Sequence, residues 1–144
     1  MSAARRLLTP RLLLVAGIGV GLLSWRETVG HVGDPDFLVD RYPLGASHAW
    51  YHAFREACGD VAKMAVFLLT FFGPSGWRTP ITWWIVLILM LGYYAPFWIG
   101  EPFLPALSAQ NLPAQIIHLV MAALAFAALI LARPSFVTLP EARK

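Results

Sequence analysis

Two long runs without a single Asp, Glu, Lys or Arg constrain this chain most, residues 81–99 and residues 114–132. An α-helix rises about 1.5 Å per residue, so about 20 apolar residues cross the ~30 Å hydrocarbon core of a bilayer. A soluble domain carries roughly a quarter charged residues, whereas this chain of 144 residues carries 13% and is 58% hydrophobic. The sequence therefore predicts an all-α integral membrane protein and excludes a water-soluble globule or a disordered chain.

Two further apolar segments complete a predicted set of four transmembrane helices. The second of the four is the weakest, because only residues 64–72 of it are apolar without interruption, about half a span. Its outer part is amphipathic. The chain is then one membrane domain, 1–144, with spans at 7–25, 47–72, 81–99 and 114–132 and extracytoplasmic loops at 26–46 and 100–113. Prolines keep the second of these loops short and irregular.

The positions of Lys and Arg predict how these helices are oriented. With a cytoplasmic N-terminus, one side of the membrane receives the basic residues Arg5, Arg6, Arg11, Arg78, Arg133, Arg143 and Lys144. The opposite loops contain the acidic residues Glu27, Asp34, Asp36, Asp40 and Glu101. The positive-inside rule therefore predicts that both termini are cytoplasmic. The very short inner loops favour a bacterial inner membrane.

The first apolar segment is expected to remain as an uncleaved anchor. Its basic start and short apolar run are also found in signal peptides. The sequence that follows, from Ser24 to Glu27, does not contain the small-residue pattern that a signal peptidase recognises. An anchored first helix is therefore the favoured interpretation.

Small residues spaced four apart predict two helix-packing faces. These are Gly17 with Gly21 in the first segment, and Ala123 with Ala127 and Ala128 with Ala132 in the fourth. In lipid, small residues let helix backbones approach closely. The sequence thus predicts a small helical bundle whose partners are the lipid bilayer and other membrane subunits or a second copy of the chain. Basic residues flank apolar runs and form no single stripe, so no nucleic-acid partner is expected.

A polar stripe follows one face of the helix over residues 47–72. Its members are three or four positions apart: His48, His52, Glu56, Asp60 and Lys63. Counted at about 1.5 Å per residue, Glu56, Asp60 and His118 lie about 18–24 Å from the inner side, in the outer third of the bilayer core. Charges at such depth are costly unless paired, so Asp60 and Lys63 are expected to form a structural ion pair.

The same layer allows two chemical hypotheses. In a catalytic site, Glu56 or Asp60 would act as general base and His118 as its proton partner. Because His118 is a lone polar residue in an apolar, Ala-rich helix, it is expected to hydrogen-bond to Tyr93, Tyr94 or Glu56.

Metal binding is the second hypothesis. His48, His52 and Glu56 have the spacing of metal ligands on one helix face. A haem would need His118 together with His48 or His52 as axial ligands. The single Cys58 excludes an internal disulfide, a CxxC redox pair and a Cys-rich zinc site. No particular cofactor is implied.

The sequence favours a non-catalytic accessory or scaffold subunit of a larger membrane assembly. The chain has little extramembrane mass and contains no phosphate-binding loop or other catalytic signature. The alternative is a small enzyme or carrier acting on a lipophilic substrate at an outer-leaflet polar site built from Glu56, Asp60 and His118.

Overall fold

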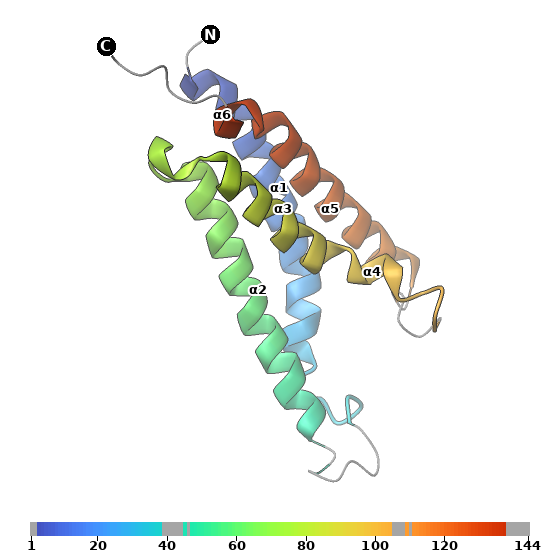
Figure 1. The fold of residues 1–144 in the computed structure, drawn as a ribbon. Coiled ribbons are helices and arrows are strands. Elements are labelled where there is room, and N and C mark those ends of the chain that lie inside the picture. The colour runs from blue at the N-terminus through green and yellow to red at the C-terminus, as the bar shows by residue number, and fades with distance from the viewer. Residues whose placement is uncertain (1–2, 39–44, 46, 105–108, 110, 138–144) are drawn as a thin grey trace, which may run out of the picture.

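The computed structural model describes residues 3–38, 45, 47–104, 109 and 111–137, and every regular element in this part of the chain is helical. The elements are α1 (Ala3–Gly30), α2 (His48–Phe72), the short 3-10 helix η1 (Ser75–Trp77), α3 (Pro80–Tyr94), α4 (Pro96–Ile99), α5 (Leu112–Ala132) and α6 (Pro134–Val137). Figure 1 shows a bundle in which α1, α2, α3 and α5 alternate in direction. The predicted all-α class is confirmed.

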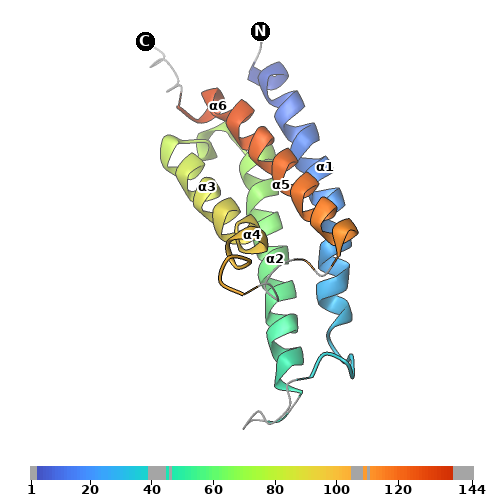
Figure 2. The same ribbon diagram turned by 90° about the vertical axis from the view of Figure 1, so that its right-hand side faces the viewer.

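The bundle has two ends, which are called proximal and distal below. The proximal end contains the start of α1, the end of α5 and the turn between α2 and α3. The distal end contains the end of α1 and the starts of α2 and α5 (Figures 1 and 2). The distal halves of α1 and α2 lie side by side in both views and extend beyond the other helices.

The prediction of four apolar spans was wrong in its number. Among the described residues, three stretches are long and apolar enough to cross a membrane: Arg6–Gly30, Pro80–Ile99 and Leu112–Ala132. The helix α2 does not qualify, because charged residues lie along its first two thirds: Arg55, Glu56, Asp60 and Lys63. The second stretch combines α3 and α4, which are separated at Ala95, directly before Pro96.

Local capping explains where the later helices begin. The side chain of Thr79 accepts a hydrogen bond from the backbone N–H of Thr82, and Pro80 occupies the first turn of α3. Asn111 caps α5 in the same way through the N–H of Ala114, at 2.9 Å. Each cap satisfies one of the backbone donors that a helix start leaves unpaired.

Side chains from other segments close the proximal end of α2. The Nε of Arg11 donates to the carbonyl oxygen of Phe71 at 2.9 Å, and its guanidinium lies 5.1 Å from the ring centroid of Phe72. Arg78 Nη1 donates to the carbonyl oxygen of Gly73 at 2.8 Å. Cations near a helix C-terminus satisfy orphan carbonyls and complement the helix dipole.

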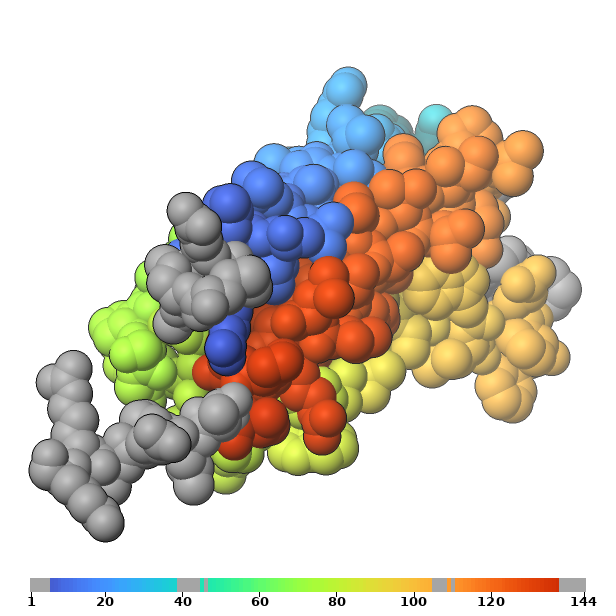
Figure 3. All heavy atoms as spheres, turned by 90° about the horizontal axis from the view of Figure 1, so that it is seen from above, coloured from blue at the N-terminus to red at the C-terminus, as the bar shows by residue number. Residues whose placement is uncertain are grey.

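The helices α1 and α5 make a close contact at Gly17. A Cβ atom added there would lie 3.2 Å from the Cβ of Leu124 and 3.2 Å from the carbonyl oxygen of Met121. At Gly21 it would lie 3.4 Å from the sulfur of Met121. Figure 3 shows α1 and α5 in contact along the bundle. Both glycines are buried in this contact.

The face that α5 turns inward contains one of the two predicted alanine pairs, Ala128 with Ala132, and not the other. Ala123 is exposed and Ala127 only partly buried. The buried alanines of this helix are Ala122, Ala125, Ala128 and Ala132. Alanines are so frequent in α5 that several four-residue spacings exist, and the side that meets α1 decides which of them is used.

Large apolar side chains fill the centre and proximal half of the bundle. The largest buried ones are Leu14, Phe67, Phe71, Val86, Met90, Met121, Leu129 and Phe136. Phe71 and Phe136 form an edge-to-face pair with their ring centroids 6.1 Å apart. Most of the polar side chains discussed below lie toward the distal end, beyond this core.

The glycine contact predicts unequal tolerance of two substitutions in α1. Gly17→Leu should destabilise the bundle by about 1–3 kcal/mol, because the added atoms meet the backbone of α5. Gly19→Leu should be neutral or stabilising, because a Cβ atom at Gly19 meets nothing within 4 Å. Thermal unfolding in detergent, followed by circular dichroism, measures both. Equal midpoints for the two variants would contradict close packing at Gly17.

Candidate functional site

The polar stripe of α2 contains one close ion pair. Lys63 Nζ lies 3.0 Å from Asp60 Oδ1, and the side chains are 32% and 5% exposed, respectively. The ammonium group of Lys63 also lies 4.8 Å from the ring centroid of Tyr93 on α3. The carboxylate of Asp60 is thus neutralised within its own helix, and the pair contacts an aromatic ring on the next one.

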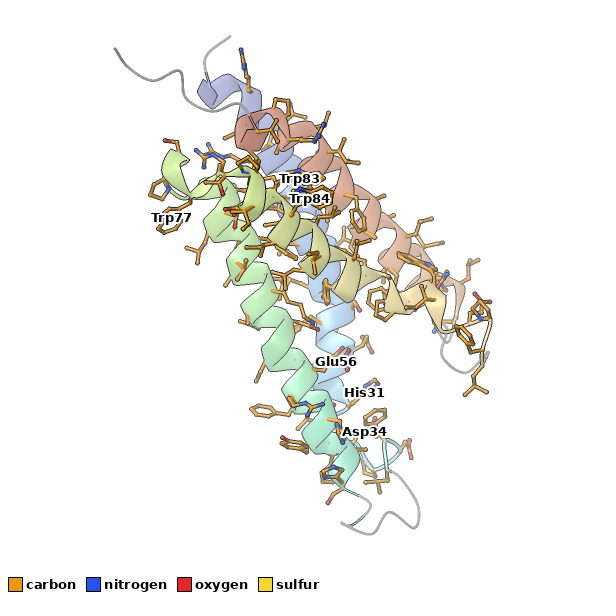
Figure 4. All side chains as sticks on the ribbon, viewed as in Figure 1. His31, Asp34, Glu56, Trp77, Trp83 and Trp84 are labelled. Carbon is orange, nitrogen blue, oxygen red and sulfur yellow. The ribbon has the colours of Figure 1, made fainter. Side chains whose placement is uncertain are left out.

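Glu56 lies one helical turn before Asp60 and is exposed. Figure 4 shows Glu56 on the outer half of α2, above His31 and Asp34 in that view, with Trp83 and Trp84 toward the opposite end. A general base in this region would have to be Glu56, because Asp60 is already engaged by Lys63.

His118 of α5 connects to different helices from those predicted. Its Nε2 lies 3.2 Å from Ser24 Oγ on α1, within hydrogen-bond distance. Its ring stacks on Phe97 of α4, with centroids 3.8 Å apart and an interplanar angle of 9°. The predicted partner from Tyr93, Tyr94 or Glu56 is therefore replaced by Ser24, because α5 lies against α1.

Two buried side-chain atoms of α5 have no hydrogen-bond partner in the described part of the chain. They are His118 Nδ1 and Gln115 Oε1. A buried polar group that is left unpaired costs roughly 1–3 kcal/mol. Such groups in a folded protein call for an explanation beyond stability, such as a bound molecule or water.

A pocket of about 500 Å³ opens beside His118 at the distal end, between α1, α4 and α5. One wall consists of Ser24, Glu27 and Thr28 of α1 and His31 directly after it, with Leu23 and Arg26 beside them. The remaining lining residues are Phe97, Ala109, Asn111, Pro113, Ala114, Ile117 and His118. Its volume lies in the range of small-molecule sites, roughly 300–1,000 Å³.

The lining of the pocket combines apolar and charged side chains. Leu23, Phe97 and Ile117 provide hydrocarbon and aromatic surface. Arg26 and Glu27 contribute one charge of each sign. This composition suits an amphiphilic molecule with a hydrogen-bonding head and an apolar body.

The residues proposed from sequence as one catalytic set fall into two places. His118 lines the pocket, whereas Glu56 and Asp60 are not among its lining residues. Sequence reasoning did not identify Ser24 or Thr28 as site residues. The predicted helix ended at residue 25, whereas α1 continues to Gly30 and so places Ser24 and Thr28 one turn apart on one helix face.

The predicted metal ligands are brought together only in part. His48 Nε2 and His52 Nε2 lie 3.0 Å apart. Within the described residues, no three of His, Cys, Asp and Glu are grouped closely enough to hold a metal, so Glu56 does not join the pair. For haem, His118 binds Ser24 while His48 and His52 pair with each other, so these residues do not form an axial pair here.

Comparisons with known protein families, with curated proteins and with solved structures found no match to this chain. Its function must therefore be inferred from the contacts described above.

The ion pair predicts that one substitution in α2 is worse than two. Asp60→Asn should destabilise the protein by roughly 1–3 kcal/mol, because Lys63, which is partly buried, loses its partner. The double variant Asp60→Ala, Lys63→Met should be milder, since neither charge then remains. Unfolding midpoints and folded yield in detergent compare the two. A double variant less stable than Asp60→Asn would contradict the pairing.

Proposed function

We propose that this chain is an integral membrane protein in which α1, α3 with α4, and α5 cross the bilayer and α2 returns beside α1. The supporting observation is the alternation of direction. The end of α1 lies at the distal end, and α3 begins at the proximal end, so α2 covers the distance between them (Figure 1).

Three features reduce the free-energy cost of placing the polar helix α2 in a membrane. Its last two turns are apolar, and the Asp60–Lys63 pair removes net charge from its middle. The indole Nε1 of Trp25 donates to the carbonyl oxygen of Ala57 at 3.0 Å, which ties α1 to the polar half of α2. Paired charges facing other helices are the form in which membrane proteins tolerate ionisable residues.

The proposed orientation puts the proximal end in the cytoplasm. Arg11, Arg78 and Arg133 all belong to this end, and the guanidinium of Arg133 lies 5.7 Å from the ring centroid of Trp83. Clustered Arg residues beside aromatic rings are typical of a cytoplasmic membrane boundary. The bacterial inner membrane remains the proposed location.

Cysteine labelling tests this orientation directly. In a Cys58→Ala background, Asp36→Cys should react with a membrane-impermeant maleimide added to whole cells. Ser75→Cys should react only after permeabilisation, because it lies in the turn at the other end; both positions are exposed in the structure. Labelling of Ser75→Cys in intact cells would reverse or disprove the proposed topology.

Within this frame we propose that the protein binds a lipophilic molecule in the distal pocket, as a carrier or ligand-binding protein. The observation that carries the proposal is the 500 Å³ pocket at which the hydrogen-bonded Ser24 and His118 adjoin apolar walls. In the proposed orientation the pocket opens near the outer boundary of the bilayer. An amphiphile could then enter from the outer leaflet.

The chemistry of the pocket supports binding more strongly than catalysis. Ser24 and His118 resemble two members of a nucleophile–base pair, but a serine nucleophile also needs its histidine oriented by a third group. Among the described residues nothing is hydrogen-bonded to His118 Nδ1. The proposed roles are therefore recognition of a polar head by Ser24 and His118 and of an apolar body by Leu23 and Ile117.

Photolabelling tests the proposed binding site. The probe is a long-chain fatty alcohol that carries a diazirine, incorporated at low density with the purified protein in nanodiscs. Labelled peptides should be enriched for the segments lining the pocket, residues 23–31 and 113–118. Ser24→Ala and His118→Phe should each reduce this labelling severalfold, and Ser75→Ala, a matched change in the distant turn, should not.

Two results would overturn the binding proposal. One is labelling spread evenly over exposed apolar positions such as Ile88 and Ile130 with no enrichment at the pocket. The other is unchanged labelling in folded Ser24→Ala and His118→Phe. Circular dichroism of each variant separates loss of the site from loss of the fold.

A second candidate is the accessory-subunit function that the sequence favours. The observation in its favour is the exposed face of the outer half of α2, where Tyr51, Phe54, Arg55 and Glu56 are uncovered by the described residues. A partner subunit could cover this mixture of charged and aromatic groups. Native mass spectrometry of gently purified protein separates the candidates. A stable heteromer supports a subunit, and a monomer or homo-oligomer with co-purified lipid supports a binding protein.

A further inference from the structure

We infer that His48 and His52 form a two-histidine binding site for a late first-row divalent transition-metal ion, with Cu²⁺ held most tightly. The site lies in the first two turns of α2, away from the lipophile pocket lined by His118. It does not depend on the function proposed for that pocket.

The distance between the two nitrogens fits one shared metal ion. His48 Nε2 and His52 Nε2 are 3.0 Å apart. With metal–nitrogen bonds of about 2.0–2.1 Å, this separation corresponds to an angle of about 95° at the ion. An angle near 90° is found between neighbouring ligands of square-planar and tetragonal sites, which Cu²⁺ and Ni²⁺ prefer.

The ring positions support the same arrangement. A head-on N–H···N hydrogen bond at this nitrogen distance would separate the ring centroids by about 5.2 Å, since each nitrogen lies about 1.1 Å from its centroid. Two rings directed at a common ion would have centroids about 4.7 Å apart at the bond lengths used above. The observed centroid distance is 4.6 Å, with the planes at 89°. The observed centroid distance is close to the value for two rings sharing one ion and shorter than that of a head-on hydrogen bond.

The surrounding residues hold the two rings in place. The helix fixes the four-residue spacing, and the ring of Tyr51 packs against both imidazoles at 5.4 and 5.6 Å between centroids. Arg55 in turn lies 5.8 Å from the centroid of Tyr51. Binding two nitrogens on one helix face needs little reorganisation, so the second bond forms at high effective concentration.

Selectivity follows from the ligand type and number. Neutral imidazole binds Cu²⁺, Ni²⁺ and Zn²⁺, and the intrinsic order of affinity places Cu²⁺ highest. Since His52 is exposed, water can complete the coordination sphere. Before metal binding, one ring donates its Nε2 proton to the other. That proton moves to Nδ1 of the same ring when the ion binds, so both Nε2 lone pairs become available.

The test uses the full-length protein in detergent, without a polyhistidine tag, titrated with CuSO₄. Electron paramagnetic resonance of the bound Cu²⁺ should show coupling to two nitrogen nuclei. His48→Gln and His52→Gln should each weaken binding at least about tenfold and leave one coupled nitrogen, because chelation is lost. His31→Gln is the matched control, since His31 stacks on Phe37 outside the pair, and it should bind Cu²⁺ like the parent protein.

Each alternative outcome overturns the inference. No Cu²⁺ bound at micromolar concentration would mean that the pair is only a hydrogen bond between imidazoles. An unchanged spectrum in His48→Gln and His52→Gln would put the bound ion on other ligands. Loss of binding in His31→Gln to the same extent would mean that the ion uses scattered surface histidines. Far-ultraviolet circular dichroism verifies that each variant remains helical.

Discussion

The contact between α1 and α5 at Gly17 is the constraint on which the rest of the bundle depends. Lipid is as apolar as leucine, so helices in a membrane gain little from hiding hydrocarbon and associate through close packing. A side chain at Gly17 would meet the backbone of α5 at Met121. The close approach brings the outer end of α1 against the start of α5. The Ser24–His118 hydrogen bond and the pocket beside it both follow from that placement.

The second helix presents the opposite problem, because it is too polar to be held by apolar packing alone. Its apolar end is anchored in the core by Phe67 and Phe71, and Arg11 closes its last turn. Its middle is neutralised by Asp60 and Lys63. We propose that this division lets α2 return through the bilayer while its outer half stays available to water or to a partner.

The polar groups of the distal end separate into three neighbourhoods with different chemistry. The ion pair on α2 contacts Tyr93, and the Ser24–His118 pair lies at the pocket. His48 and His52 stand apart at the start of α2. In sequence, Glu56, Asp60 and His118 look like one layer, since they are at similar counts from the helix ends, whereas His48 and His52 lie farther out on α2. Because these side chains belong to different helices or to different turns of α2, they divide into a structural pair, a proposed lipophile site and a proposed metal site.

The sequence by itself determined the helical class, the approximate helix positions and the Asp60–Lys63 pairing, because these depend on local composition and on spacings of three or four residues. It also singled out Gly17 as a close-contact residue. Only the tertiary structure decided that His118 meets Ser24 instead of Tyr93, that Ala125 rather than Ala123 faces inward, and that Glu56 and Asp60 are separate from the pocket. The physical reason is that periodicity fixes which residues share a helix face, whereas the rotation and neighbours of each helix are set by packing against the others.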